Sequence, residues 1–487
     1  MSKDVKKIDV AVIGAGFGGI GVGIALRKKG IENFVIFEGG DEVGGSWLTN
    51  RYPGCACDVP SHLYSYSFAP NPRWTQAYSS HSEIHQYIMD CAEKFDLYRH
   101  IAFKTPVSAA NFNAEKGVWE ITTKNGERVN ARVLIPATGA LSLPKFPDIE
   151  GRESFKGEQI HAANWDNSIN LRGKRVAVIG TGASAVQVVP SIAADVEHLY
   201  VFQRTASWVL PKMNRQYSEA EKRTWTRYPI TQKLSRYFIY WTMEVAAPAL
   251  IWFPKLLKLG QLAHRRHLHK AIQDPVLRDK LTPRYQLGCK RALVSDDFYP
   301  TFNRSNVTLV TDGIESMDST GFSVAGGDKI DVDVVIYTTG YETGEPMFPF
   351  TIHGKNGTNL TDYWAGQPKA YYGMNVSDYP NMGLIMGPNA GPGHTSVLIY
   401  QEAQYKYLAN YAKHIIDNDI KSLDIKKAEM DGMFQWAQKR MKNSTWLSGC
   451  ASWYLNEDGT NSTMWPGFSF EYLWRTRNLN LDAYHQS

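Results

Sequence analysis

The first stretch that could support chemistry is a glycine-rich loop near the start of the chain. Gly14, Gly16 and Gly19 follow the pattern G-x-G-x-x-G, after a short apolar run and before a helical pattern. Such glycines allow a tight turn and bring the backbone close to a pyrophosphate, whose charge the N–H groups at a helix N-terminus stabilise. A second apolar run ends at Glu38, where a carboxylate can accept hydrogen bonds from a ribose 2′-hydroxyl. The combination predicts a bound dinucleotide.

A second loop of the same kind contains Thr181, Gly182 and Ser184, again between an apolar run and a helical pattern. The next apolar run ends in Arg204 and Thr205, where the first unit has an acid. A carboxylate would repel a 2′-phosphate, whereas a guanidinium and a hydroxyl would bind it. The loop therefore favours NADP(H) over NAD(H), although Arg204 could also be a surface residue beside an NAD-type loop.

The length of the chain indicates more than one domain, because 487 residues exceed what a single hydrophobic core usually supports. Two dinucleotides held in one chain carry out redox chemistry with each other, and the order of the loops favours FAD at the first and NADP at the second. We expect an α/β fold with two Rossmann-like dinucleotide-binding domains and a helical insertion. The FAD-binding domain takes residues 1–145 and 335–487, and the NADP-binding domain takes residues 146–334 with the insertion at 208–287.

Charge and cysteine content limit the possible partners and the cellular compartment of the protein. A net charge of +5 without any run of Lys and Arg argues against a nucleic-acid partner. The cysteines are too few, and odd in number, for a disulfide framework, which favours a reducing compartment and hence the cytoplasm. Only one residue separates the first two, so a C-x-x-C redox centre is not expected. The cysteines are Cys55, Cys57, Cys91, Cys289 and Cys450.

Residues 237–257 are apolar enough to raise the question of a membrane. Glu244, Pro248 and Pro254 argue against a span, and a buried or partner-facing helix broken at its prolines is favoured. A peripheral contact with a membrane surface is the alternative. The three histidines within 263–270 lie among bases without a carboxylate or cysteine, so a solvated helix face and no metal site is expected there.

The chain resembles the class B flavoprotein monooxygenases over essentially its whole length, and within them the type I Baeyer–Villiger monooxygenases. The resemblance rests on the two glycine loops in this order and on two further strings. GGSWLTNRYPGCACD, residues 44–58, fits that family's pattern at every fixed position. FKGEQIHAANWD, residues 155–166, has Trp165 where the N- and S-oxygenating relatives have Tyr.

The resemblance implies an NADPH- and O2-dependent enzyme. NADPH reduces FAD, the reduced flavin takes up oxygen as a C4a-peroxide, and the peroxide converts an apolar ketone to an ester or lactone. Arg291 matches the active-site arginine, which stabilises negative charge because it cannot lose its own proton. Asp58 is expected to pair with Arg291, although two unrelated loop charges remain an alternative. Lys290 matches the position that joins Arg204 and Thr205 on the 2′-phosphate.

Further cofactor-binding positions follow from the same resemblance. Trp47 and Tyr64 match flavin-side positions, but as bulky residues they could equally be core packing. An apolar ketone pocket is expected near these two, Met386, residues 387–394 and Trp453, the last in a mobile C-terminal segment. The remaining cofactor-binding residues are Gly45, Val107 and Gln187.

The string at 155–166 is expected to connect the two domains. In the family its histidine is tied to domain movement and activity, while a satisfied structural histidine is the alternative. The small-residue turns at 137–139 and 338–341 are where the chain is expected to leave and re-enter the FAD-binding domain. The fixed positions of the connector are Phe155, Gly157, His161 and Trp165.

Two other functions stay open. One is an N- or S-oxygenating flavin monooxygenase, which Trp165 followed by Asp166 disfavours. The other is a flavin and NADP redox sensor without turnover, which the presence of Arg291 and Asp58 disfavours. Either would still need both dinucleotides.

Overall fold

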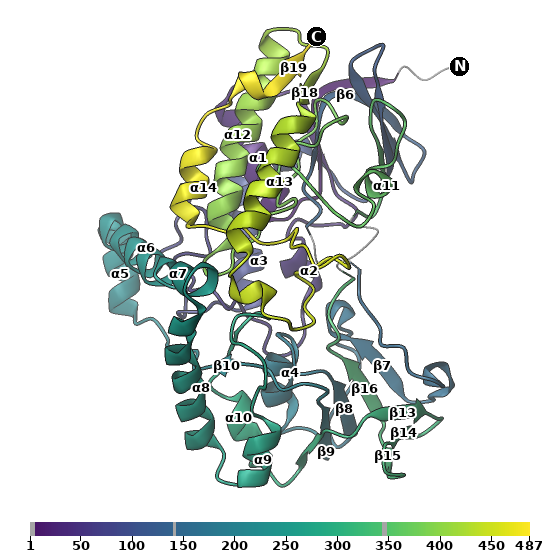
Figure 1. The fold of residues 1–487 in the computed structure, drawn as a ribbon, viewed down its shortest axis with the longest axis vertical. Coiled ribbons are helices and arrows are strands. Elements are labelled where there is room, and N and C mark those ends of the chain that lie inside the picture. Colours follow the sequence, from purple (N-terminus) through teal and green to yellow (C-terminus); the bar gives the residue numbers. More distant parts are fainter. Residues whose placement is uncertain (1–4, 140–142, 343–347) are drawn as a thin grey trace.

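The first sheet lies in the upper lobe of the molecule as drawn in Figure 1, and the computed structural model describes residues 5–139, 143–342 and 348–487. β1 pairs in parallel with β2 and β6, and Val10, Ala11 and Val12 of β1 have no exposed surface. Such an unbroken buried run is typical of a strand covered on both faces. The strands, in spatial order, are β17 (Thr351–His353), β4 (Val107–Asn113), β5 (Val118–Thr123), β6 (Arg128–Pro136), β1 (Lys6–Ile13), β2 (Phe34–Phe37) and β3 (Ile101–Ala102).

Helices from both ends of the chain complete this lobe. They are α1 (Phe17–Lys28), α2 (Ser46–Thr49), α3 (His81–Lys94), α11 (Leu360–Trp364), α12 (Val397–Asp417), α13 (Lys427–Met441) and α14 (Ser469–Arg475). α1 and α12 lie side by side (Figure 1). A Cβ on Gly21 of α1 would lie 2.1 Å from the ring of Tyr405 on α12, so glycine is what lets the helices touch. Strands β18 (Leu423–Ile425) and β19 (Tyr484–Gln486) pair near the C-terminus.

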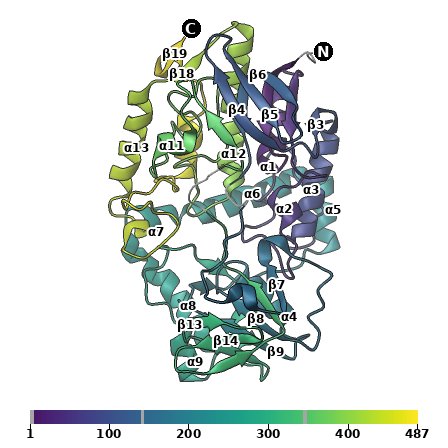
Figure 2. The same ribbon diagram turned by 90° about the vertical axis from the view of Figure 1, so that its right-hand side faces the viewer.

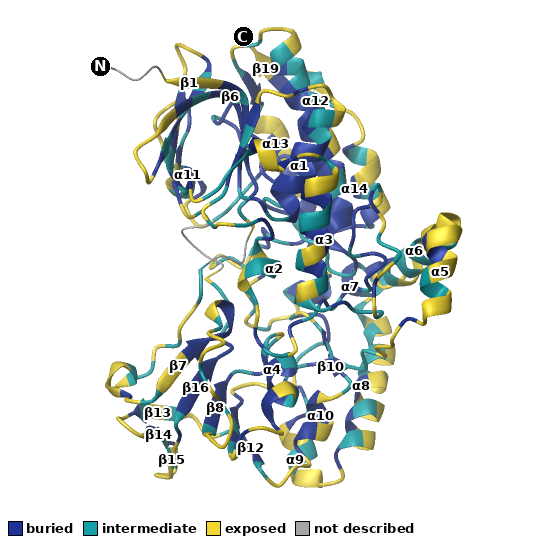
Figure 3. Ribbon diagram, turned by 180° about the vertical axis from the view of Figure 1, so that it is seen from behind, coloured by how far each residue is buried: buried dark blue, intermediate teal, exposed yellow. Residues whose placement is uncertain are grey.

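The second sheet forms the lower lobe and is parallel throughout (Figures 1 and 2). Its strands, in spatial order, are β12 (Val307–Val310), β9 (His198–Phe202), β8 (Arg175–Ile179), β16 (Val334–Tyr337) and β7 (Glu158–His161). The central strands of both sheets are mostly buried (Figure 3). Because all of β16 pairs in this sheet, the second unit extends to Tyr337, past the boundary expected at residue 334. An antiparallel ribbon follows β12: β13 (Ile314–Met317), β14 (Gly321–Val324) and β15 (Lys329–Asp331).

A helical insertion lies between the parallel pair β10 (Val209–Leu210) and β11 (Leu293–Val294). Its helices are α5 (Glu219–Arg227), α6 (Pro229–Glu244), α7 (Ala247–Ile251), η4 (Pro254–Leu257), α8 (Lys258–Ala271) and α9 (Pro275–Lys280). The apolar stretch 237–257 is divided among α6, α7 and η4, so the predicted break at its prolines is confirmed. The stretch is not buried as a whole, since Phe238, Val245 and Phe253 are exposed. Within the described ranges, no helix is long and apolar enough to cross a bilayer.

The prediction of a solvated helix face at 263–270 is wrong for one of its histidines. His264 of α8 is completely buried, because α8 packs against β10. Its Nδ1 lies 3.1 Å from the carbonyl oxygen of Val209, and its ring contacts that of Trp208 edge-on. In the part of the chain that the structure describes, no group of three or more potential ligands could hold a metal ion.

Two adjacent linkers join the lobes. The N–H of Lys145 donates to the carbonyl oxygen of Gly340 at 2.9 Å, and the N–H of Glu342 donates to that of Leu143 at 2.8 Å. The segment that leaves the upper lobe therefore runs antiparallel to the one that returns. The turns at 137–139 and 338–341 had been expected as the points of exit and re-entry, and the pairing between the segments was not predicted.

The connector string lies directly below these linkers. Phe155 is buried in the core of the lower lobe, and His161 ends β7, the edge strand of its sheet. The ring of His161 packs 5.1 Å from Phe146 and 6.4 Å from Tyr341, so it contacts both linkers. Burial lowers the pKa of His161, and its Nδ1 accepts a hydrogen bond from the N–H of Ala163. These contacts suit a neutral packing group at the junction of the lobes.

Gly157→Ala should lower the free energy of unfolding by about 1–3 kcal/mol through overpacking. The added Cβ would lie 2.4 Å from the carbonyl oxygen of Asp333 and 2.5 Å from the ring of Phe155. Urea and thermal unfolding measure the effect. Gly313→Ala is the matched control, because no heavy atom lies within 4 Å of its added Cβ. An equal loss in both variants would contradict the packing role of Gly157.

Candidate active site

The first glycine loop has the geometry of a dinucleotide cradle. Gly14 adopts φ +103°, and a Cβ on Gly19 would lie 1.8 Å from the carbonyl oxygen of Gly14. Helix α1 starts after Gly16 without a side-chain cap and without an acid in its first turn, so its N-terminal N–H groups can face an anion. Glu38 accepts hydrogen bonds at the loop from Ala15 N–H (2.7 Å) and from the N–H of residue 40 (2.8 Å). These residues fit the pyrophosphate and ribose of FAD.

The string at 44–58 folds back onto this loop. Gly45 adopts φ +54°, and its added Cβ would lie 3.0 Å from the Cα of Gly16. Nε1 of Trp47 donates to the hydroxyl of Tyr64 at 3.0 Å, with the two rings edge to face. Burial raises the pKa of Tyr64, so its phenol stays neutral. Trp47 and Tyr64 thus form one hydrogen-bonded pair beside the first loop.

The other end of the string docks on the lower lobe. Gly54, at φ +78°, packs against the carbonyl oxygen of Gln187 on α4 (Ala185–Ile192), where a Cβ would lie only 2.6 Å away. The Gln187 side chain donates to the carbonyl oxygen of Ala56 at 2.8 Å and accepts from the hydroxyl of Tyr52 at 3.0 Å. The string therefore spans from the first nucleotide loop to the helix that follows the second.

Asp58, at the end of the string, forms the expected ion pair with Arg291. Nε and Nη2 of Arg291 both donate to Oδ2 of Asp58, at 2.8 and 2.6 Å. The negative charge of Asp58 is the main reason that the pKa of Arg291 is raised, so the guanidinium stays charged. The side chain of Arg291 is 50% exposed, and contact with water also favours its charged form. The pair places a permanent positive charge between the two nucleotide loops.

The second loop has an open anion site with two cations. Gly182 faces open space, and Ser184 begins α4 without a side-chain cap bond. Arg204 and Thr205 follow β9 and are exposed. The pKa of Lys290 is lowered, first by burial and then by the charge of Arg204, so these two cations lie close together. A 2′-phosphate would relieve their repulsion, so the residues fit NADP.

Comparison with known proteins identifies the family. Residues 6–361 match the family model described as flavin-binding monooxygenase-like. A Baeyer–Villiger monooxygenase of Pseudomonas aeruginosa is 39% identical over 98% of this chain and 91% of its own length. One of Streptomyces coelicolor is 40% identical over 98% and 92%. The chain belongs to the flavin-binding monooxygenase family. Its full-length relatives place this monooxygenase in the Baeyer–Villiger branch, which confirms the resemblance.

Solved structures agree with the fold. OTEMO in complex with FAD and NADP matches this monooxygenase with a TM-score of 0.90 at 27% identity, over 99% of this chain and 100% of the other. Cyclohexanone monooxygenase from Rhodococcus sp. Phi1, bound to NADP+, matches with a TM-score of 0.88 at 27% identity and the same coverage. The prediction of two Rossmann-like units in a flavoprotein enzyme is confirmed.

Other predicted positions lie apart from the ion pair. Val107 begins β4 and is buried in the core of the upper lobe. Met386, at φ +58°, packs on the same core cluster as Trp47 and Tyr64. Trp165 is half-buried against the core of the lower lobe. Trp453 is 51% exposed. The roles of these four residues in binding or specificity stay predictions.

Two residues near the ion pair went unnoticed in the sequence. Tyr454, rather than its neighbour Trp453, is the buried aromatic residue close to Arg291. Burial raises the pKa of Tyr454, and the positive charge of Arg291 opposes that effect. Lys212 contributes a second cation near Asp58, and burial lowers its pKa. Neither belongs to a recognisable motif, because only the folded chain brings them to the pair.

A buried contact between a histidine and a glutamate at the rim of the site was also missed. Nε2 of His394 lies 2.8 Å from Oε2 of Glu244, and both side chains are at most 2% exposed. Oε1 of Glu244 accepts from the N–H of Ser469 at 2.6 Å. The contact joins the loop 387–394 to α6 and α14. A single acid within an apolar stretch was the available signal, since a buried charge needs a partner.

A disulfide joins Cys289 to Cys450, a bond that the number of cysteines did not predict. They lie 161 residues apart in sequence, and the C-terminal segment folds over the Arg291 loop to bring them together. The hydroxyl of Thr445 donates to the carbonyl oxygen of Leu287 in the same contact. The remaining cysteines, Cys55, Cys57 and Cys91, are buried free thiols. A cytoplasmic location stays a prediction.

Arg291→Lys should lower the rate of product formation about 10²–10³-fold while FAD stays bound, because lysine keeps the charge but loses the forked contact with Asp58. Steady-state rates and flavin absorbance measure the effect. Arg284→Lys is the matched control, since its ion pair with Asp279 is exposed and should matter little. Wild-type turnover in Arg291→Lys would show that this arginine has no role in the active site.

Cys450→Ser should lower the free energy of unfolding by about 2–4 kcal/mol and raise the KM for NADPH, because the C-terminal segment is no longer fastened beside Lys290. Thermal unfolding and steady-state kinetics measure both effects. Reduction of the wild type by dithiothreitol should reproduce them and should leave the Cys450→Ser variant unchanged. Cys91→Ser, at a free thiol, is the control that should not respond in KM.

Proposed function

We propose that the protein converts ketones to esters or lactones with NADPH and O2. The balanced reaction is ketone + NADPH + O2 + H+ → ester + NADP+ + H2O. The observation that carries the proposal is the Asp58–Arg291 ion pair between two loops that fit FAD and NADP. An oxygen-insertion reaction of this kind develops negative charge on oxygen, and a fixed cation in the site stabilises it.

FAD, when bound, supplies the hydride acceptor and the oxygen-activating chemistry. The residues of the chain provide position and charge. Arg291 holds its proton throughout, because Asp58 raises its pKa, so its positive charge does not vary with the progress of the reaction. Asp58 orients the guanidinium by accepting from two of its nitrogens. We assign Arg291 to charge stabilisation and Asp58 to its positioning.

The second loop sets the choice of reductant. Arg204, Thr205 and Lys290 supply two charges and a hydroxyl, which suit the 2′-phosphate of NADPH and have no partner in NADH. Gln187 acts on the same side by fixing the string at 44–58 to α4, directly after this loop. The nicotinamide nucleotide and the flavin are thereby bound by segments that are hydrogen-bonded to each other.

The substrate class follows from the rim of the site. Trp47, Tyr64 and Met386 lie along one apolar cluster, and the loop 387–394 is fixed beside it through His394. Such a lining offers apolar area with few polar anchors, which suits an apolar ketone.

The test incubates the purified yellow protein with NADPH, labelled O2 and a panel of linear, cyclic and aryl ketones. The expected result is ester or lactone carrying one labelled oxygen atom, with one NADPH consumed per product.

Arg204→Ala should raise the KM for NADPH about tenfold and leave the KM for NADH unchanged, because the variant loses charge-assisted hydrogen bonds to the 2′-phosphate. Steady-state kinetics with each reductant measure the effect.

Three outcomes would overturn the proposal. Formation of hydrogen peroxide without an ester from any ketone would show that the protein does not oxygenate ketones. Amine or sulfide oxides as the only products would indicate an N- or S-oxygenating enzyme. Failure of NADPH to bleach the flavin without oxygen would indicate a redox sensor.

A further inference from the structure

Helix α6 has its polar residues on the inside. Gln232 and Glu244 are its buried residues, and both make hydrogen bonds to the body of the protein. Nε2 of Gln232 donates to the carbonyl oxygen of Asn71 at 2.6 Å, and Ser235 contacts Nδ1 of His62 at 2.9 Å. Ile239, Tyr240 and Met243 also pack half-buried against the core of the upper lobe. A surface helix normally buries its apolar stripe and exposes its polar one; because this helix also turns polar side chains inward and an apolar stripe outward, we call it inverted.

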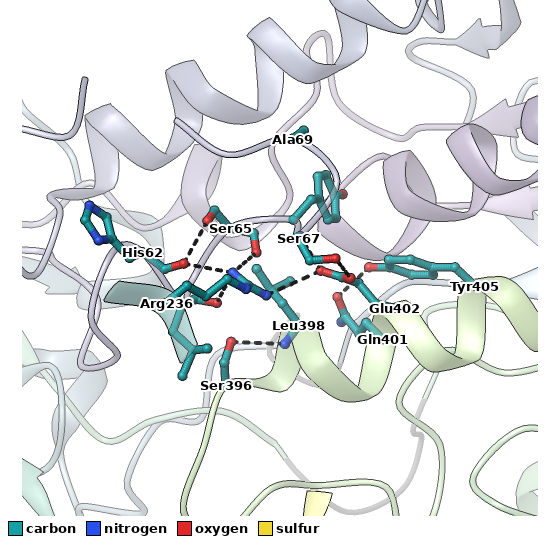
Figure 4. Close-up of polar contacts among 12 residues, drawn as sticks. His62, Ser65, Ser67, Ala69, Arg236, Ser396, Leu398, Gln401, Glu402 and Tyr405 are labelled. Atoms are coloured by element: carbon teal, nitrogen blue, oxygen red, sulfur yellow. Dashed lines mark hydrogen bonds and ion pairs between the residues drawn. The ribbon is translucent and has the colours of Figure 1, made fainter. Parts of the chain in front are cut away.

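Arg236 is the central inward contact of α6 (Figure 4). Its Nη1 donates to the carbonyl oxygens of His62 and Ser65, each at 2.8 Å, and to that of Leu63 at 3.2 Å. Its Nη2 lies 3.6 Å from the carboxylate of Glu402 on α12. Three carbonyl acceptors and a carboxylate fix the rotation of the helix, so its outward face is determined by polar contacts.

The outward face of α6 is an apolar stripe. Its members recur at helical spacing, and the most exposed are Phe238 (72%) and Val245 (75%). The full stripe consists of Ile230, Leu234, Tyr237, Phe238, Trp241 and Val245.

Neighbouring elements extend the stripe. The rings of Trp241 and Phe470 lie 6.1 Å apart, which joins α6 to α14. The elements α14, α6 and α8 follow one edge of the molecule in Figures 1 and 3. These three helices hold 10 of the 20 exposed large hydrophobic side chains among the described residues, and Val245, Phe253 and Leu256, between α6 and α8, bring the number to 13. A concentration of that kind marks an interaction site. We call this surface the apolar edge; beyond the α6 stripe it contains Phe253, Leu256, Leu259, Leu262, Phe470, Leu473 and Trp474.

The charges around the apolar edge are positive. From residue 222 to residue 273 the chain has ten Lys or Arg and one acid, and that acid, Glu244, is buried against His394. Of the ten bases, Arg236 faces inward and Lys222 is paired with Glu219, which leaves eight. Glu471 on α14 is bonded to Arg440 and Arg475. The surface therefore complements a partner that is apolar inside and negatively charged at its face.

We propose that the apolar edge binds the surface of an anionic lipid bilayer without crossing it. Its aliphatic and aromatic side chains would enter the boundary between headgroups and acyl chains, with Lys233, Lys255 and Lys258 at the anionic headgroups. A second copy of the chain fits less well, because a twofold axis at this edge would bring the same bases together. The proposal goes beyond the oxygenation reaction and does not depend on it.

Flotation of the FAD-loaded protein with vesicles tests the proposal. The wild type should float with vesicles that contain phosphatidylglycerol and much less with pure phosphatidylcholine. Binding should fall in about 1 M salt, where the Debye length is about 3 Å. The double variant Phe238→Glu, Trp241→Glu should lower the bound fraction about tenfold or more, since the stripe no longer enters the bilayer. The double variant Leu259→Glu, Leu262→Glu on α8 is the second test, and it should also lower the bound fraction, because both residues belong to the apolar edge.

Val276→Glu is the matched control, because Val276 is equally exposed on α9 but lies outside the apolar edge. Flavin absorbance, thermal unfolding and turnover of a water-soluble ketone should stay at wild-type values in all variants. Three results would overturn the proposal. They are no binding by the wild type, an equal loss in the Val276 control, or a concentration-dependent dimer that the stripe variants disrupt while vesicles bind nothing.

Discussion

The ion pair between Asp58 and Arg291 is the interaction on which the rest of the site depends. Its two partners belong to different lobes, so both lobes must be held in register for the contact to form. On one side, the string at 44–58 is fixed at Gly45 by the first glycine loop and at Gly54 by α4. On the other side, the disulfide next to Lys290 fastens the Arg291 loop to the C-terminal segment. The charge in the centre is thus positioned by contacts at three places.

The junction of the lobes explains why the string at 155–166 contains both packing residues and a histidine. Gly157 has no room for a side chain, and Phe155 is buried, so these positions hold the start of β7. His161 contacts the paired linkers through Phe146 and Tyr341. A change in the angle between the lobes would have to be absorbed by those linkers. A neutral ring packed against both can follow such a change without uncovering a buried charge.

The sequence predicted most of what depends on local geometry. Glycine loops, the acid after β2 and the basic residues after β9 are each set within a few residues, and the structure places them as that geometry requires. What depends on distant segments was missed or misjudged. The Cys289–Cys450 bond spans 161 residues, and His264 is buried by packing on β10. The strand β16 belongs to the lower lobe because of its partners, β7 and β8; the turn at 338–341 indicated this, and the boundary drawn at residue 334 did not follow it.

The inverted helix α6 connects the outer surface to the site. Arg236 holds the carbonyl oxygens on either side of Tyr64, and Glu244 holds His394 at the end of the loop 387–394. A helix that buried only apolar side chains could not donate hydrogen bonds to backbone carbonyl oxygens in this way. The polar inner face therefore serves to position the rim of the site, and the apolar residues are left for the outside. Because one helix carries both faces, a partner bound to the outer stripe also affects the position of the two segments at the rim, the turn around Tyr64 and the loop 387–394.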